Sequence, residues 1–201
     1  MDIITDSVNR MEETLRHSGC DETGVRLDVD PDTKNCQFER GACMTASFGG
    51  RTAEFVTDEP IRALTKISFM FGTPLETSNV RSAACAIMNV VTAFFCLNRV
   101  RRACPGESHA TCLGELAAEL QGHRVFCGST MPALERALGS VITPDFDEAD
   151  TIVINNESVI DREIGDLIVR TREKKRVIFV GPSTAGVCRL QQREHWCPYG
   201  K

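Results

Sequence analysis

The sequence predicts an α/β protein whose second half is a parallel sheet with flanking helices. In that half, short β-branched runs alternate with helical stretches of about ten residues. Strands that alternate with helices in this way imply a parallel sheet joined by crossover connections. The first half differs, because a hairpin-like stretch and a long Ala-rich stretch predict a small α+β unit. We therefore divide the chain into domains 1–103 and 104–201.

The N-terminal domain is expected to contain a helix, a hairpin and a long buried helix. Apolar side chains recur near helical spacing in residues 2–17, namely Ile3, Ile4, Val8, Met11 and Leu15. The run CMTASFGGRTAEFVT predicts two strands around a Gly49-Gly50 turn. Ser78 or Asn79 is expected to cap a helix over about residues 80–99, which is apolar nearly all round and therefore buried.

The C-terminal domain is expected to follow a polar connector at 99–112. Its predicted helices cover 112–122, 131–139 and 158–175, and its predicted strands cover 124–129, 140–143, 151–155 and 176–180. Ser158 and Asp161 stand at the spacing of a capping box at the start of the third helix. Ser183 or Thr184 is expected to cap a final short helix.

Three polar turns follow the predicted parallel strands. They are Gly128-Ser129-Thr130, Asn155-Asn156-Glu157-Ser158 and Gly181-Pro182-Ser183-Thr184. Ligands of open parallel sheets bind beyond the carboxyl ends of the strands, so these turns are the predicted ligand-binding cleft. Glu157 is a candidate cation ligand or general base, and backbone N–H groups near Ser183 are candidates for holding an anion. Each turn taken alone is equally consistent with a simple reversal of the chain.

The charge and hydropathy of the sequence argue against two classes of partner, nucleic acids and membranes. The formal net charge is −5, which gives no reason to expect nucleic acid or an anionic membrane as a partner. The N-terminus lacks an apolar signal core, and the apolar stretch around residues 83–97 is too short to span a bilayer. We therefore expect a cytoplasmic protein.

Ten cysteines are present without any C-x-x-C pair, which argues against zinc-ribbon, thioredoxin and iron–sulfur sites. Two Cys/His trios are candidate sites for zinc or another soft cation: Cys188, His195 and Cys197 in the tail, and Cys104, His109 and Cys112 in the connector. Neither spacing is that of a standard structural zinc site. The alternative for the tail is a free, partly exposed terminus.

The sequence lacks the common cofactor and catalytic signatures. The run CGSTMPALERALG has one glycine at its turn, where a dinucleotide fingerprint has three. No P-loop and no G-x-S-x-G elbow occur, so Ser183 is interpreted as a helix cap and not as a nucleophile.

Three stretches resemble a family named for heavy-metal chelation. They are SNVRSAACAIMNVV, RVFCGSTMPAL and TIVINNESVIDREIGDLIVRTREKKRVIFVGPST. The resemblance covers most of residues 38–187 and implies a Rossmann-like domain preceded by an enolase-N-terminal-like domain, with the active site in the cleft between them. Members usually continue past the Gly-Pro turn with another strand and helix, so the Rossmann-like part is expected to be truncated here. The two Cys/His trios are not features that we associate with the family.

Three functions remain open from the sequence. The first is a binding protein for a metal or a metal complex in the interdomain cleft. The second is an enzyme acting on a small anionic or nucleoside-like ligand in the same cleft, and the third is a non-catalytic structural or regulatory module. A shortened sheet would expose an edge strand, so a homodimer is also expected.

Overall fold

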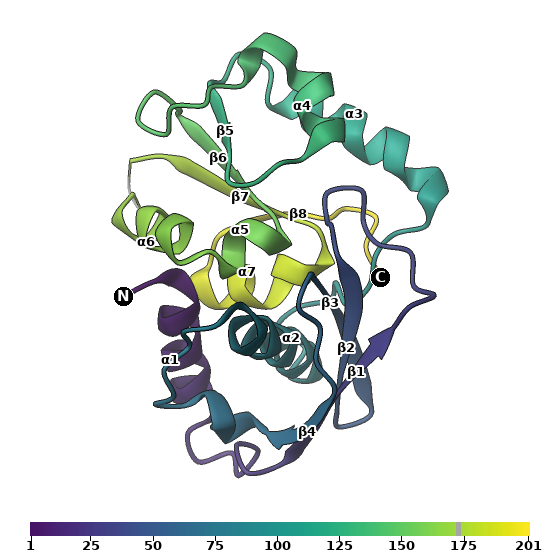
Figure 1. Cartoon of the computed structure of the whole chain (residues 1–201), viewed down its shortest axis with the longest axis vertical. Helices are drawn as coiled ribbons and strands as arrows, with labels where there is room; N and C mark the ends of the chain where they lie inside the picture. The colour runs from purple at the N-terminus through teal and green to yellow at the C-terminus, as the bar shows by residue number, and fades with distance from the viewer. Residues whose placement is uncertain (172–173) are drawn as a thin grey trace.

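The computed structural model describes residues 1–171 and 174–201 and shows an α/β protein with two sheets (Figure 1). The chain begins with helix α1 (Ile3–Leu15), whose five predicted apolar positions are all buried. An antiparallel sheet of order β3-β2-β1-β4 follows, formed by β1 (Gly24–Asp30), β2 (Ala42–Phe48), β3 (Arg51–Thr57) and β4 (Ala63–Lys66). The predicted Gly49-Gly50 turn joins β2 to β3, with φ values of 53° and 75° that glycine adopts without strain.

Helix α2 (Ser78–Phe94) packs against the antiparallel sheet after the 3₁₀ turn η1 (Ile67–Met70). It is buried along most of its length, as its nearly all-round apolar sequence predicts. Both ends of this helix differ from the predicted range of about residues 80–99. Thr77 is the N-cap residue in place of Ser78 or Asn79, and the helix stops at Phe94 because Cys96 adopts a left-handed φ of 57°.

The second sheet is parallel, with the order β5-β6-β7-β8. Its strands are β5 (Val125–Cys127), β6 (Thr151–Ile154), β7 (Arg176–Val180) and β8 (Glu194–Trp196). The helices of this half are η2 (Gly106–Ser108), α3 (His109–Glu119), α4 (Pro132–Leu138), η3 (Gly139–Val141), α5 (Asn156–Ile160), α6 (Arg162–Arg170), η4 (Pro182–Thr184) and α7 (Ala185–Gln191). The sequence does not predict strand β8, because its pattern in the tail indicates a free terminus or a metal site.

Both faces of the parallel sheet are covered, which explains why its strands read as continuous apolar runs. Ile152 and Ile154 of β6 point into a core shared with α2, α5, α6 and α7. Val153, which lies between them, points into a second core with α3 and α4. This alternation is the two-residue period of a strand with a core on each side.

Two further predicted elements differ from the structure. The helix expected over 158–175 is two helices, since Asn155 caps α5 with Ser158 as its reciprocal partner, and Asp161 caps α6 by accepting from Ile164 N. Ser158 is therefore not an N-cap residue. Residues 172–173 of the expected helix lie outside the described residues. The strand expected at 140–143 is reduced to an isolated bridge between Val125 and Ile142.

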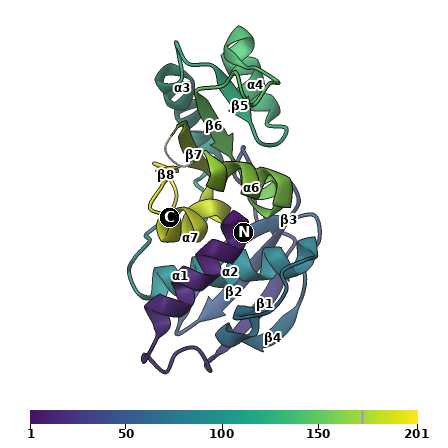
Figure 2. The same cartoon turned by 90° about the vertical axis from the view of Figure 1, so that its left-hand side faces the viewer.

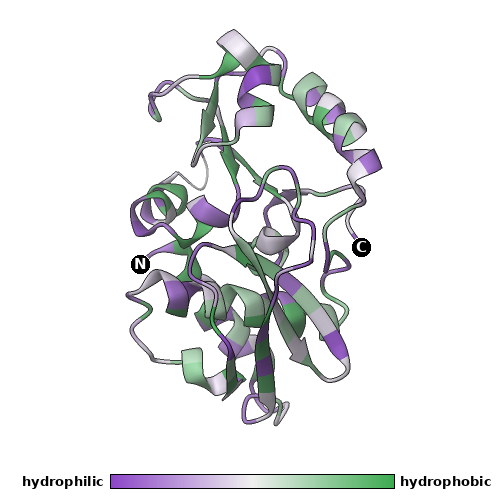
Figure 3. Ribbon diagram, turned by 45° about the vertical axis from the view of Figure 1, so that its right-hand side comes forward, coloured by the Kyte–Doolittle hydropathy of each residue, from purple (hydrophilic) through white to green (hydrophobic). Residues whose placement is uncertain are grey.

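The two halves of the chain share one hydrophobic core, which includes residues from α1, α2, β6, β7 and α7. In Figure 2, α1 lies along α2 and α7. Arg81 of α2, which is 1% exposed, pairs with Asp2 at 2.8 Å and also donates to Ile160 O of α5. In Figure 3 the hydrophobic residues concentrate on the strands of the parallel sheet and on the helices between the sheets. Within the described part of the chain, every helix is too short or too polar to cross a membrane.

Candidate functional site

The three polar turns lie at one edge of the parallel sheet, as expected. Each follows the carboxyl end of β5, β6 or β7, and these strands pair in parallel with their neighbours. Ser129 Oγ of the first turn donates to Asn155 Oδ1 of the second at 2.7 Å. Ile142 forms a parallel bridge with Val125 on one side of β5, and β6 pairs with β5 on the other side. After β5, the chain therefore passes first to Ile142 on one side and then to β6 on the opposite side. The direction of winding therefore reverses between β5 and β6, and a crevice at such a reversal is where open α/β sheets bind ligands.

The Gly181–Thr184 turn is already occupied by the chain itself. Its Ser183 N–H donates to Oε1 of Glu39 at 2.8 Å, and Glu39 comes from the loop between β1 and β2. Gly181 has φ 81°, and a Cβ atom at this position would collide with the Glu39 carboxyl group. The place that the sequence predicts for an anion at this turn is thus taken by the internal side chain of Glu39. In Figure 1 the β1–β2 loop reaches up to the parallel sheet.

Glu39 is held in an environment that favours its neutral form. Its side chain is 6% exposed, and its Oε2 has no hydrogen-bond partner among residues 1–171 and 174–201. Burial raises the pKa of Glu39 to about 8, although the Ser183 N–H opposes this shift. The buried Glu39 carboxyl packs the β1–β2 loop against the Gly181–Thr184 turn and takes the space that a ligand would need there.

Thr184 is the N-cap residue of α7, one of the two expected, but it makes no side-chain capping hydrogen bond, and both Ser183 and Thr184 form hydrogen bonds within the core. Ser183 Oγ accepts from Val56 N of β3 at 2.8 Å, and Thr184 Oγ1 donates to Val180 O and Gly181 O at 3.1 Å. Asn89 of α2 completes this network. Its Nδ2 donates to Ser183 O and Glu54 O at 2.9 Å, and its Oδ1 accepts from Gly186 N at 2.7 Å. Ser183 is 0% exposed, which excludes it as an accessible nucleophile.

The Asn155–Ser158 turn is polar and only partly closed. Asn155 Nδ2 donates to Phe38 O at 2.9 Å, so the β1–β2 loop also contacts this turn. Asn156 Nδ2 donates to Arg40 O and Val56 O at 2.9 Å each. Asn156 is 1% exposed, yet no residue in the described part of the chain forms a hydrogen bond with its Oδ1. A buried amide oxygen without a partner is unusual and needs an explanation.

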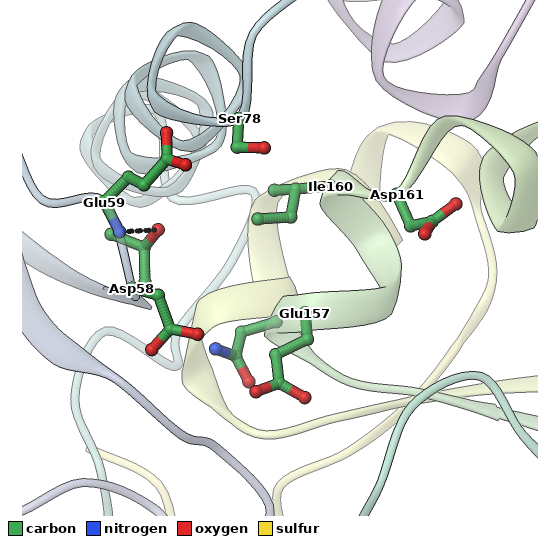
Figure 4. A pocket seen from close by; sticks show the side chains of 8 residues that line it. Asp58, Glu59, Ser78, Glu157, Ile160 and Asp161 are labelled. Carbon is green, nitrogen blue, oxygen red and sulfur yellow. Dashed lines mark hydrogen bonds between the residues drawn. The ribbon is translucent and has the colours of Figure 1, made fainter.

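A cavity of about 300 Å³ opens beside this turn (Figure 4). It lies between the end of β3, the start of α2, and α5 with the residue that follows it. Its lining consists of Thr57, Asp58, Glu59, Ser78, Asn156, Glu157, Ile160 and Asp161. In Figure 4, Asp58 and Glu157 extend from opposite walls toward the same space, whereas Asp161 lies farther to the side. We call this cavity the acidic cavity.

The acidic cavity joins segments from both halves of the chain. Four of its residues are carboxylic acids, and the described residues that line it include no Lys, Arg or His. Asp161 Oδ1 already accepts from Ile164 N, whereas Glu157 and Asp58 have no ion-pair partner in the described chain. Of the predicted cleft, only Asn156 and Glu157 line this cavity. The remaining predicted residues lie in packed turns or outside it: Gly128, Ser129, Thr130, Asn155, Ser158, Gly181, Pro182, Ser183 and Thr184.

Sequence reasoning missed Asp58, Glu59 and Ser78. The signal for the first two was present, since Asp58-Glu59-Pro60 directly follows a predicted strand and reads as a polar turn. The sequence does not show that this turn faces Glu157, which lies about a hundred residues later in the chain.

Neither predicted Cys/His trio forms a metal site. Cys188 Sγ is buried and donates to Arg193 O at 3.1 Å, while His195 Nε2 donates to Gly181 O at 2.9 Å. Burial raises the pKa of Cys188 to about 12 and lowers the pKa of His195. Among the described residues, which include all ten cysteines, no group of three or more His, Cys, Asp or Glu side chains is arranged to hold a metal ion.

The tail and the connector are nevertheless brought together. Arg101 N and Arg102 N both donate to Lys201 O, so the last residues run beside the connector. Cys197 lies near Cys104 and Cys112, whereas Cys188 and His195 form hydrogen bonds elsewhere, to Arg193 O and Gly181 O. The structure therefore separates the tail trio, and all ten thiols are free.

Comparison with known proteins adds a likeness in fold. No protein family matches the chain, and no curated protein matches it either. A crystal structure of a protein of unknown function from the DUF364 family of Desulfitobacterium hafniense DCB-2 is similar, with a TM-score of 0.52 and 17% identity. The alignment covers 94% of this chain and 81% of that chain. The chain thus has a DUF364-like fold, and its assignment to the heavy-metal chelation family stays a prediction.

Proposed function

We propose that this protein binds a small cationic ligand in the acidic cavity: a metal ion that keeps its own shell of water or chelator. The observation that carries the proposal is the cavity between the two halves of the chain, lined by four carboxylic acids and by buried Asn156, whose Oδ1 accepts no hydrogen bond from the described residues. Carboxylate and amide oxygens are acceptors that suit the N–H or O–H donors of such a shell.

The spacing of the carboxylates favours a ligand with a shell over a bare ion. No trio of acids in the described chain is placed to coordinate one ion directly. A cavity of about 300 Å³ is at the small end of known ligand pockets, and it leaves space for a complex. Charge attraction then acts through hydrogen bonds from the shell to Asp58, Glu157 and Asn156.

An enzyme acting on a small anion at the same place is less well supported. An anionic ligand would meet Asp58, Glu59 and Glu157 without a balancing cation from the described lining. The Ser183 hydroxyl at the same sheet edge is buried and accepts from Val56 N, so it does not supply a nucleophile for such a reaction. Glu157 remains available to either function.

Hexaamminecobalt(III) tests the proposal, because its ammine shell does not exchange and it can bind only through that shell. We expect saturable one-to-one binding by titration calorimetry at low ionic strength. Glu157→Gln and Asp58→Asn should each weaken binding about five-fold, since each removes one carboxylate charge at short range. Glu107→Gln, which removes an exposed carboxylate of η2 far along the chain from the cavity, is the matched control and should change affinity less than two-fold, about the scatter for distant surface sites.

Two results would contradict the proposal. One is the absence of saturable binding. The other is an equal loss of affinity in Glu157→Gln and Glu107→Gln, which would mean that the complex responds only to net charge.

A further inference from the structure

A second pair of cavities lies beside the carboxyl-terminal ends of α2 and α7. The smaller has a volume of about 200 Å³ and is lined in part by Arg99, Arg189 and Arg193. The larger, of about 700 Å³, includes Arg10. Leu97 and Arg189 line both cavities, so the two adjoin, and we call the pair the arginine groove.

The charge of the arginine groove is opposite to that of the whole chain. The chain carries a formal net charge of −5, yet the described lining of the groove has four arginines and one carboxylate, that of Glu13. Arg10 is paired with Asp6 at 2.9 Å. Arg99 and Arg189 are exposed, and in the part of the chain that the structure describes no carboxylate lies within ion-pair distance of either.

Helix dipoles explain only one of these arginines. Arg189 lies in the last turn of α7, where a positive charge is favourable. Arg99 lies beyond the end of α2 and Arg193 beyond the end of α7, and both reach the same small cavity. Arg99 and Arg189, which have no ion-pair partner among the described residues, repel each other across this space unless an anion lies between them.

The backbone fixes this convergence. Helices α2 and α7 pack closely, because Gly186 has no side chain and a Cβ atom there would collide with Asn89. Each helix ends in a left-handed residue, Cys96 with φ 57° and Gln192 with φ 53°. These turns direct the following segments, with Arg99 and Arg193, back to the shared cavity.

We propose that the arginine groove binds a small phosphate ester. The phosphate occupies the smaller cavity, where the planar donor forks of the arginines match its oxygens. The organic part lies along the larger cavity, where Leu97, with 37% of its surface exposed, and Leu190 offer apolar contact. This site is separate from the acidic cavity, with which it shares no lining residue.

Titration calorimetry with inorganic phosphate and phenyl phosphate, at constant ionic strength set by sodium chloride, tests this site. We expect saturable one-to-one binding of both, with phenyl phosphate about ten-fold tighter because its ring covers apolar surface. The double variant Arg99→Gln/Arg189→Gln removes two exposed charges and should weaken the binding of both ligands by about 20-fold or more. Arg51→Gln, an exposed arginine at the start of β3, is the matched control and should change affinity less than two-fold, about the scatter for distant surface sites.

Chemical-shift mapping and a second ligand separate this proposal from that for the acidic cavity. Phosphate should move the amide signals of residues 96–100 and 185–195, and the double variant should bind hexaamminecobalt(III) as the wild type does. The proposal is overturned by the absence of saturable binding at concentrations up to about 10 mM, a range that detects even millimolar affinity. It is equally overturned by shifts confined to other residues, or by a loss of affinity in the double variant no larger than in Arg51→Gln.

Discussion

The Gly181–Thr184 turn and the Asn155–Ser158 turn follow neighbouring strands of one sheet, yet they have different roles. The first is filled by Glu39 and tied to β3 through Ser183. The second borders an open cavity and presents Glu157 to it. The two turns have similar polar composition, so the difference comes from the segments packed against them. A polar turn at the carboxyl edge of a parallel sheet is a site only where no other part of the chain fills it.

The largest effect is expected from removing the amide that holds the filled turn. Asn89→Ala leaves Gly186 N–H and Ser183 O without their buried partner and should lower the free energy of unfolding by about 3 kcal/mol. Urea unfolding measures this loss. Asn9→Ala, which removes an exposed amide of α1, is the control and should cost less than about 0.5 kcal/mol. A loss below about 1 kcal/mol for Asn89→Ala would show that the turn is not held by this network.

The next effect concerns the proton on Glu39. Its pKa is about 8 in the folded protein and near 4.5 in an unfolded chain, so the unfolded chain ionises first as the pH rises. The contribution of Glu39 to the free energy of unfolding is therefore fully present below pH 4.5. It falls by about 1.4 kcal/mol per pH unit up to about pH 8, where Glu39 also ionises in the folded protein.

Glu39→Gln removes this dependence and keeps an acceptor for Ser183 N–H. Between pH 6 and 7.5 the wild type should lose about 2 kcal/mol more than the variant in urea unfolding. Burial also raises the pKa of Glu54, which contributes in the same direction, so the difference between the two proteins isolates Glu39. Glu107→Gln should retain the slope of the wild type. Parallel pH profiles for the wild type and Glu39→Gln would mean that Glu39 is ionised when buried.

The smallest effects are expected from one substitution in each of the two turns, Ser183→Ala and Glu157→Gln. Ser183→Ala leaves Val56 N–H without an acceptor and should cost about 1.5 kcal/mol in urea unfolding, with no change in hexaamminecobalt(III) affinity. Glu157→Gln should cost less than about 0.5 kcal/mol and should weaken that affinity. If Ser183→Ala alone weakened the binding of the complex, the assignments of the two turns would be reversed.

Much of the fold follows from local patterns. The spacing of Ile4, Val8 and Met11 predicts α1, and the Gly49-Gly50 pair predicts the β2–β3 hairpin; both are confirmed. Errors occur where a local signal has two meanings. Ser158 and Asp161 stand at capping-box spacing, yet they belong to two different helices, because Asn155 supplies the first cap. The β8 strand was missed because three residues next to a Cys/His pattern carry little β signal.

The sequence by itself determined that β5, β6 and β7 run in parallel and that their polar turns share an edge, because alternating strands and helices permit few other arrangements. Only the tertiary structure decided which turn is open. Glu39 and Asp58 come from the other half of the chain, and no local pattern shows that the first fills one turn while the second faces Glu157 across a cavity. Such contacts depend on how the two halves pack, and their shared core sets that packing.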